Sequence, residues 1–112
     1  MKVIVAGSRS ITDLSVVEEA IHLSGFTITE VVCGDARGVD SLGEEWADLH
    51  DVPVKHFPAD WSQGKMAGFS RNNHMADYAE ALVAVWDSKS KGTGHMIAIA
   101  RSRKLPVFVH TV

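Results

Sequence analysis

The residues best suited to chemistry gather in a short loop between an apolar run and a helical pattern. Residues 88–94 read Ser-Lys-Ser-Lys-Gly-Thr-Gly, so glycines, hydroxyls and cations lie side by side. Glycines let backbone N–H groups at a helix start approach an anion without side-chain obstruction. An ordinary strand-to-helix turn, whose glycines only relieve backbone strain, explains the same residues. Because neither GxxxxGK[ST] nor GxGxxG is present, the loop alone leaves a phosphate site and a plain turn both open.

Cations form a second group of candidates, because they fall in or near the loops that follow the expected strands. The chain as a whole carries a net charge of −3, so a one-sided set of cations favours an anionic ligand, although solvated loops also collect charge. The set is Arg9, Arg37, Lys65, Arg71, Lys89 and Lys91.

Carboxylates, a tryptophan and a thiol share these loops. Asp35 and Asp87 are the better catalytic or binding candidates, whereas Asp40 is expected to cap a helix or to complement its dipole. Trp61 lies in a polar loop, where it could stack on a base or anchor the loop. Cys33 is expected to be a buried, inert thiol. The six histidines show no paired spacing typical of a metal site, so no metal is expected.

The elements that must position these residues alternate between strands and helices. Strands are expected at residues 2–6, 29–33, 53–57 and 106–109, and in the apolar run that ends at Trp86. Helices are expected at residues 13–24, from 39 to 49, at 65–79, and from the glycine loop to residues 101–104. Thr12 is the expected N-cap of the first helix. The second helix should bury a stripe of apolar side chains, namely Val39, Leu42, Trp46 and Leu49.

Strands that are apolar at successive positions and alternate with helices predict an α/β fold. We expect a Rossmann-like three-layer sandwich with a five-stranded parallel sheet, in the order 3-2-1-4-5. Ligands of such sheets bind at the switch point, here between the first and fourth strands. The loops after the strands, with their glycines and charges, should therefore meet at one rim.

Length and composition restrict the class of protein. The 112 residues suit one domain, 1–112, and the 46% apolar and 22% charged residues are typical of globular proteins. The acidic net charge argues against nucleic acid and anionic membranes as partners. No cofactor is indicated, and homo-oligomerisation is left open. The first strand begins too early for a signal peptide, so cytoplasmic residence is the default expectation.

Several short motifs together carry a family resemblance. They are residues 7–9, 34–40, 58–61, 67–68 and 92–94, together with Arg71, Asn72 and Met75. The chain resembles the SLOG superfamily, and more narrowly its YspA and YpsA-related branch, over residues 2–110. The resemblance implies a Rossmann-like domain that binds a nucleotide or nucleotide-derived ligand. With the residue-based candidates, the expected binding set is Gly7, Ser8, Arg9, Gly34, Asp35, Arg37, Trp61, Arg71, Asn72, Asp87, Gly92, Thr93 and Gly94.

A more distant likeness is to the LOG phosphoribohydrolases, which release cytokinin bases from their 5′-monophosphates. Arg71 matches their catalytic arginine, but Met96 stands where their catalytic glutamate would fall. Glycosidic cleavage passes through a cationic sugar that needs a carboxylate, which here only Asp35, Asp60 or Asp87 could supply. We therefore rank a nucleotide-binding or sensing module first. An N-glycosidic hydrolase or transferase that uses Arg71, Asp35 or Asp87 is the alternative, and nucleic-acid binding is third.

Overall fold

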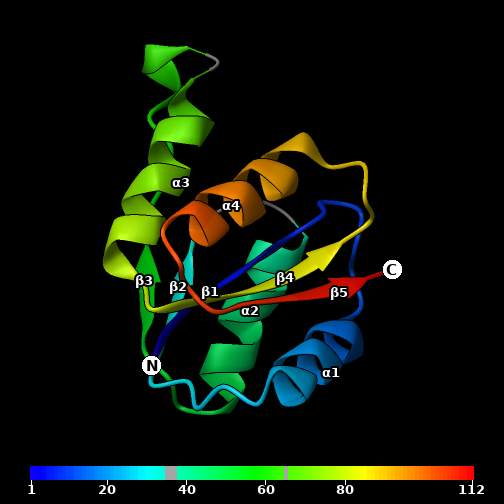
Figure 1. The fold of residues 1–112 in the computed structure, drawn as a ribbon. Coiled ribbons are helices and arrows are strands. Elements are labelled where there is room, and N and C mark those ends of the chain that lie inside the picture. Colours follow the sequence, from blue (N-terminus) through cyan, green and yellow to red (C-terminus); the bar gives the residue numbers. More distant parts are fainter. Residues whose placement is uncertain (35–37, 65) are drawn as a thin grey trace.

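A computed structural model describes residues 1–34, 38–64 and 66–112 and contains a five-stranded parallel sheet between two pairs of helices (Figure 1). The strands are β1 (Lys2–Gly7), β2 (Glu30–Cys33), β3 (Val54–His56), β4 (Ala81–Trp86) and β5 (Val107–Thr111). The helices are α1 (Leu14–Ser24), α2 (Val39–Leu49), α3 (Ala67–Tyr78), α4 (Lys91–Ser102) and the 3₁₀ helix η1 (Trp61–Gln63). The strand order is β3-β2-β1-β4-β5, which confirms the predicted fold.

The two faces of the sheet build two separate apolar cores. Successive side chains of a strand point to opposite faces. Val3 and Val5 of β1 therefore join the core under α1 and α2, whereas Ile4 and Ala6 join the core under α3 and α4. Figure 1 shows α3 and α4 on one side of the sheet and α1 and α2 on the other. This covering of both faces explains why the inner strands are apolar at successive positions.

The parallel arrangement brings the loops after β1 and β4 together. The two strands are direct neighbours, with Gly7 of β1 paired in register with Val85 of β4. The chain leaves β1 toward α1 on one face, and it leaves β4 toward α4 on the other. A crevice at their carboxyl ends follows from this reversal.

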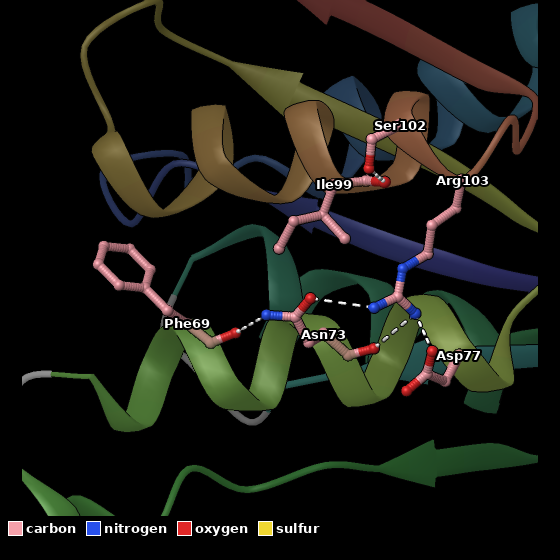
Figure 2. Close-up of polar contacts among 6 residues, drawn as sticks. All are labelled: Phe69, Asn73, Asp77, Ile99, Ser102 and Arg103. Atoms are coloured by element: carbon pink, nitrogen blue, oxygen red, sulfur yellow. Dashed lines mark hydrogen bonds and ion pairs between the residues drawn. The ribbon is translucent and has the colours of Figure 1, made fainter.

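A polar cluster fastens α3 to α4 at the end remote from the glycine loop. Arg103 follows α4 directly, and its guanidinium donates to the backbone carbonyl of Asn73 at 3.2 Å and to the Asn73 Oδ1 at 3.0 Å. It also pairs with Asp77, and Figure 2 shows these contacts crossing from α4 to α3. The two helices that flank the crevice are thus joined by side chains as well as by the shared core.

Three local predictions were wrong. The first helix is capped by Asp13 instead of Thr12, since the Asp13 Oδ1 accepts from the Ser15 N–H at 2.9 Å. Leu49 is 64% exposed. At about 100° per residue it lies roughly 200° around α2 from the buried Ala47, away from the sheet. α3 begins two residues later than expected, at Ala67.

None of the helices formed by the described residues is both long enough and apolar enough to cross a bilayer.

Candidate functional site

A cavity of about 180 Å³ opens at the carboxyl ends of β1 and β4, between α3 and α4. Its walls combine the end of β1, the start of α4 and the first half of α3, with contributions from α2 and η1. The lining residues are Ala6, Gly7, Arg9, Asp40, Trp61, Gly68, Phe69, Arg71, Asn72, Met75, Ser90, Gly92, Thr93 and Met96. The cavity therefore lies at the predicted switch point.

Arg71 is the central cation of this cavity. Its Nη1 donates to the backbone carbonyl of Gly34, and its Nε donates to the Oδ1 of Asn72 at 3.2 Å. No carboxylate within the described ranges lies at ion-pair distance from it. The guanidinium is thus held in place by neutral acceptors, and its charge is not neutralised by the side chains that hold it.

The absence of a side chain at Gly34 makes room for this arrangement. A Cβ atom built on Gly34 would lie 2.7 Å from the Cζ of Arg71, which is closer than such atoms approach. The Gly34 N–H donates to the Oδ2 of Asp40 at 3.2 Å. Gly34 therefore links a buried carboxylate on one side to the guanidinium on the other.

Hydrogen bonds of the Asn72 side chain connect Arg71 to α4. A guanidinium only donates hydrogen bonds, so the Asn72 oxygen faces Arg71 and its amide nitrogen faces away. That nitrogen donates to the Gly92 carbonyl at 3.3 Å and lies 3.2 Å from the Nδ1 of His95. The Nδ1 must then accept, which requires a neutral imidazole. Burial lowers the pKa of His95 and favours the same neutral form.

The loop before α4 is organised by Asp87 and Ser90. The Asp87 Oδ1 accepts from the Ser90 N–H at 2.9 Å and from the Lys89 N–H at 2.8 Å, and these bonds lower its pKa. Ser90 caps the helix, because its Oγ accepts from the Thr93 N–H at 3.5 Å. The backbone N–H of Asp87 in turn donates to the Ser8 Oγ at 3.0 Å, joining the two crevice loops.

The expected site residues divide into three groups. One group lines the cavity: Gly7, Arg9, Trp61, Arg71, Asn72, Gly92 and Thr93. A second group supports its walls from behind, namely Ser8, Gly34, Asp87 and Gly94. The third group, Asp35 and Arg37, lies outside the residues that the structure describes, as does the expected rim cation Lys65. Lys89 and Lys91 are exposed and do not line the cavity.

The sequence reading missed part of the cavity wall. Asp40 lies in the first turn of its helix, as a dipole-complementing residue would, and is 6% exposed. It also accepts from the Gly34 N–H and lines the cavity, which was not expected. Met75 and Met96 are almost fully buried and form an apolar part of the wall. Their helical spacing from Arg71 and Thr93 was a usable signal, because residues three or four apart share a helix face. Gly68 and Ser90 belong to stretches that the sequence had singled out, but they were not in the expected binding set, and Phe69 gave no signal.

Comparison with known proteins places the chain in a family. The profile of the YspA, cpYpsA-related SLOG family matches residues 1–64, which is less than the extent suggested by the motifs. The chain is also similar to the Gene 61 protein of Mycobacterium phage D29, with 32% identity over 117 residues that cover 95% of this chain and 93% of that protein. No solved structure gave a significant match. The chain therefore belongs to the YspA, cpYpsA-related SLOG family.

Proposed function

We propose that this protein binds a nucleotide-derived anion at the carboxyl edge of its sheet, between β1 and β4. The observation that carries the proposal is Arg71, whose guanidinium lines the cavity while only neutral groups hold it. A phosphate could accept bidentate hydrogen bonds from such a guanidinium and would supply the missing negative charge. Arg9, also in the wall, adds a second cation.

The start of α4 supports a phosphate in particular. The first N–H groups of a helix have no partner within the helix, and their dipoles favour an anion. Gly92 and Thr93 lie in this first turn and line the cavity, and a Cβ built on Gly92 would meet no neighbouring atom. The Thr93 N–H is already bound by the Ser90 Oγ, so the Gly92 N–H is the first-turn donor that this part of the wall offers to an anion.

The size of the cavity favours a ligand that is only partly enclosed. Pockets for drug-sized ligands usually measure roughly 300–1,000 Å³, whereas this cavity measures about 180 Å³. A phosphate with its ribose fits that space better than a whole nucleotide. The base would then project toward Trp61, whose side chain is 61% exposed and offers a stacking face.

The same cavity gives less support to the alternative, an N-glycosidic hydrolase or transferase. Met96 is 1% exposed and puts a thioether in the wall where a phosphoribohydrolase would carry its glutamate. Asp87, a candidate to replace that glutamate, accepts hydrogen bonds from its own loop. Asp60 likewise accepts from Ser62. Binding without turnover is therefore the function that we favour.

The test is thermal unfolding with a panel of nucleoside mono- and diphosphates, cyclic nucleotides and sugar nucleotides. A true ligand at 100 times its dissociation constant should add about 2.7 kcal/mol, a melting shift on the order of 10 °C. Arg71→Met should lose the shift, whereas Arg101→Met, an exposed cation in the last turn of α4, should keep it. A panel without any shift would overturn the proposal. Free base released from a monophosphate would favour the hydrolase.

A further inference from the structure

Three side chains with metal-binding atoms meet where β2 and β3 end, and none of them lines the cavity that contains Arg71. Cys33 and His56 are register partners in the parallel ladder, so both point to the same face of the sheet. Val31, two residues before Cys33, belongs to the core under α2, which identifies that face. Glu44 comes from α2 itself. One donor atom from each residue lies within 4.8 Å of the other two.

The distance between Cys33 and His56 suits a tetrahedral metal ion, since the Cys33 Sγ lies 3.5 Å from the His56 Nδ1. The Glu44 Oε1 lies 3.7 Å from the other ring nitrogen, Nε2, and one ion binds only one of the two nitrogens. A Glu44 oxygen still lies within 4.8 Å of one donor atom of each of the other two residues. Zinc bonds of 2.3 Å to sulfur and 2.0–2.1 Å to nitrogen, at a tetrahedral angle, separate the two donors by about 3.5 Å. Thiolate with imidazole selects zinc-like ions over magnesium or calcium.

The surroundings attract cations and leave a path for entry. A groove beside the cluster is lined by Glu44, Glu45 and Asp48, together with Ser41, Val52 and Val54, and no cationic side chain is among these lining residues. Its negative potential raises the local cation concentration. The side chains of His56 and Glu44 are 41% and 50% exposed, so they can adjust around an ion, while Cys33 is buried and fixed.

We infer that Cys33, His56 and Glu44 form a binding site for Zn²⁺ or a similar thiophilic divalent cation, with the fourth position open to water. Chain spacing could not reveal it, because each donor comes from a different element. This inference goes against the expectation of no metal, which rested on spacing alone. It does not depend on the proposed nucleotide site, whose cavity shares none of these three residues.

The test is a titration of metal-free, reduced protein with Co²⁺, followed by displacement with Zn²⁺. The wild type should develop a thiolate-to-cobalt charge-transfer band in the near ultraviolet, and Zn²⁺ should abolish it. Cys33→Ser should lack the band. Glu44→Gln and His56→Gln should bind at least about tenfold more weakly. Glu18→Gln, which changes an exposed carboxylate on α1 outside the groove, is the matched control and should bind like the wild type.

Contrary outcomes are equally clear. A wild type without the band would show that the Cys33 thiolate binds no cobalt, and the site would be rejected. A band that persists in Cys33→Ser would also reject it. If Cys33→Ser fails to fold, the test rests on the two exposed ligands, Glu44 and His56. Unchanged cobalt affinity in both Glu44→Gln and His56→Gln would overturn the assignment.

Discussion

At the scale of single residues, the hydrogen-bond partners of Arg71 are the most informative about function. A guanidinium that served only the fold would normally meet a carboxylate, because an unpaired cation loses solvation when it is partly buried. Arg71 instead meets a backbone carbonyl and an amide oxygen. It is therefore positioned before any anion arrives, which reduces the ordering cost of binding one.

We predict that Arg71→Met weakens anion binding strongly and lowers the free energy of unfolding only moderately. Methionine keeps much of the apolar stem and removes two hydrogen bonds, so the unfolding free energy should fall by about 1–3 kcal/mol. The loss of a buried ion-pair partner would cost about 3–5 kcal/mol instead. Anion affinity should fall at least about tenfold. Denaturant melts and ligand titrations of both proteins measure the two effects. A badly destabilised variant that binds normally would make Arg71 a structural residue.

Residue types predicted that the candidate residues meet at one rim, and seven of them line the cavity, but the sequence did not assign partners among them. Asp87 was expected to face a ligand, yet it accepts N–H bonds from its own loop. Asp40 was expected to cap its own helix or complement its dipole, and from its place in the first turn it also accepts from the Gly34 N–H. At a given sequence position, a carboxylate can face a ligand or can accept hydrogen bonds from the protein itself. The choice depends on distances between loops, which a single sequence does not contain.

At the scale of elements, α2 lies unusually close to β1 at Gly43. A Cβ built there would be 2.8 Å from the Val5 Cγ1 and 2.9 Å from the Val5 Cβ. Glycine in a helix usually costs about 1 kcal/mol relative to alanine. At this position the close approach of helix and strand, and not helix propensity, therefore decides which residue fits.

We predict that Gly43→Ala lowers the melting temperature although it improves helix propensity. Overpacking of a filled core costs about 1–3 kcal/mol, which exceeds or cancels the roughly 1 kcal/mol gained. Gly92→Ala is the matched control, since a Cβ there would meet nothing nearby, and it should not destabilise the unliganded protein. Thermal melts of both variants measure the difference. A Gly43→Ala protein more stable than the wild type would contradict the packing argument.

Helices and strands were predictable where the sequence has a periodic pattern. Their first and last residues were harder to predict. The alternation of apolar strands and helices indicated all five strands and the four longer helices, because burial on both faces imposes that pattern. The 3₁₀ helix η1, a single turn capped by Asp60, has too few residues for any period. The Cys33–His56 pairing depends on the register of β2 with β3, which two short strands do not reveal.

At the scale of the whole molecule, two hollows of the surface differ in charge. Among the described residues, Arg9 and Arg71 line the cavity with a single carboxylate, Asp40, whereas Glu44, Glu45 and Asp48 line the groove on α2. The net charge of −3 conceals this division. The strand order predicted that all loops after the strands would share one edge, but not which helix faces would carry each charge.

The final prediction concerns the pH dependence of the free energy of unfolding, to which titratable groups throughout the molecule contribute. Burial lowers the pKa of His95 from 6.5, so the unfolded chain takes up a proton more readily than the folded protein. Neutral His95 therefore contributes in full to the free energy of unfolding above pH 6.5, and this contribution is lost as the pH falls through the lowered pKa. Hydrogen bonds from Ser15, Ser62 and Ser90 likewise lower the pKa values of Asp13, Asp60 and Asp87 from 3.8. Those contributions are complete above pH 3.8 and disappear below it.

Denaturant melts at a series of pH values should therefore show two stages of destabilisation, one below pH 6.5 and one below pH 3.8. His95→Gln should remove the first stage only, because glutamine offers the Asn72 amide an acceptor that does not titrate. The control is His22→Gln, at an exposed position of α1, which should keep both stages. If His95→Gln retained the first stage, the neutral imidazole would not be the acceptor that orders Asn72. The path from Arg71 to α4 would then need a different explanation.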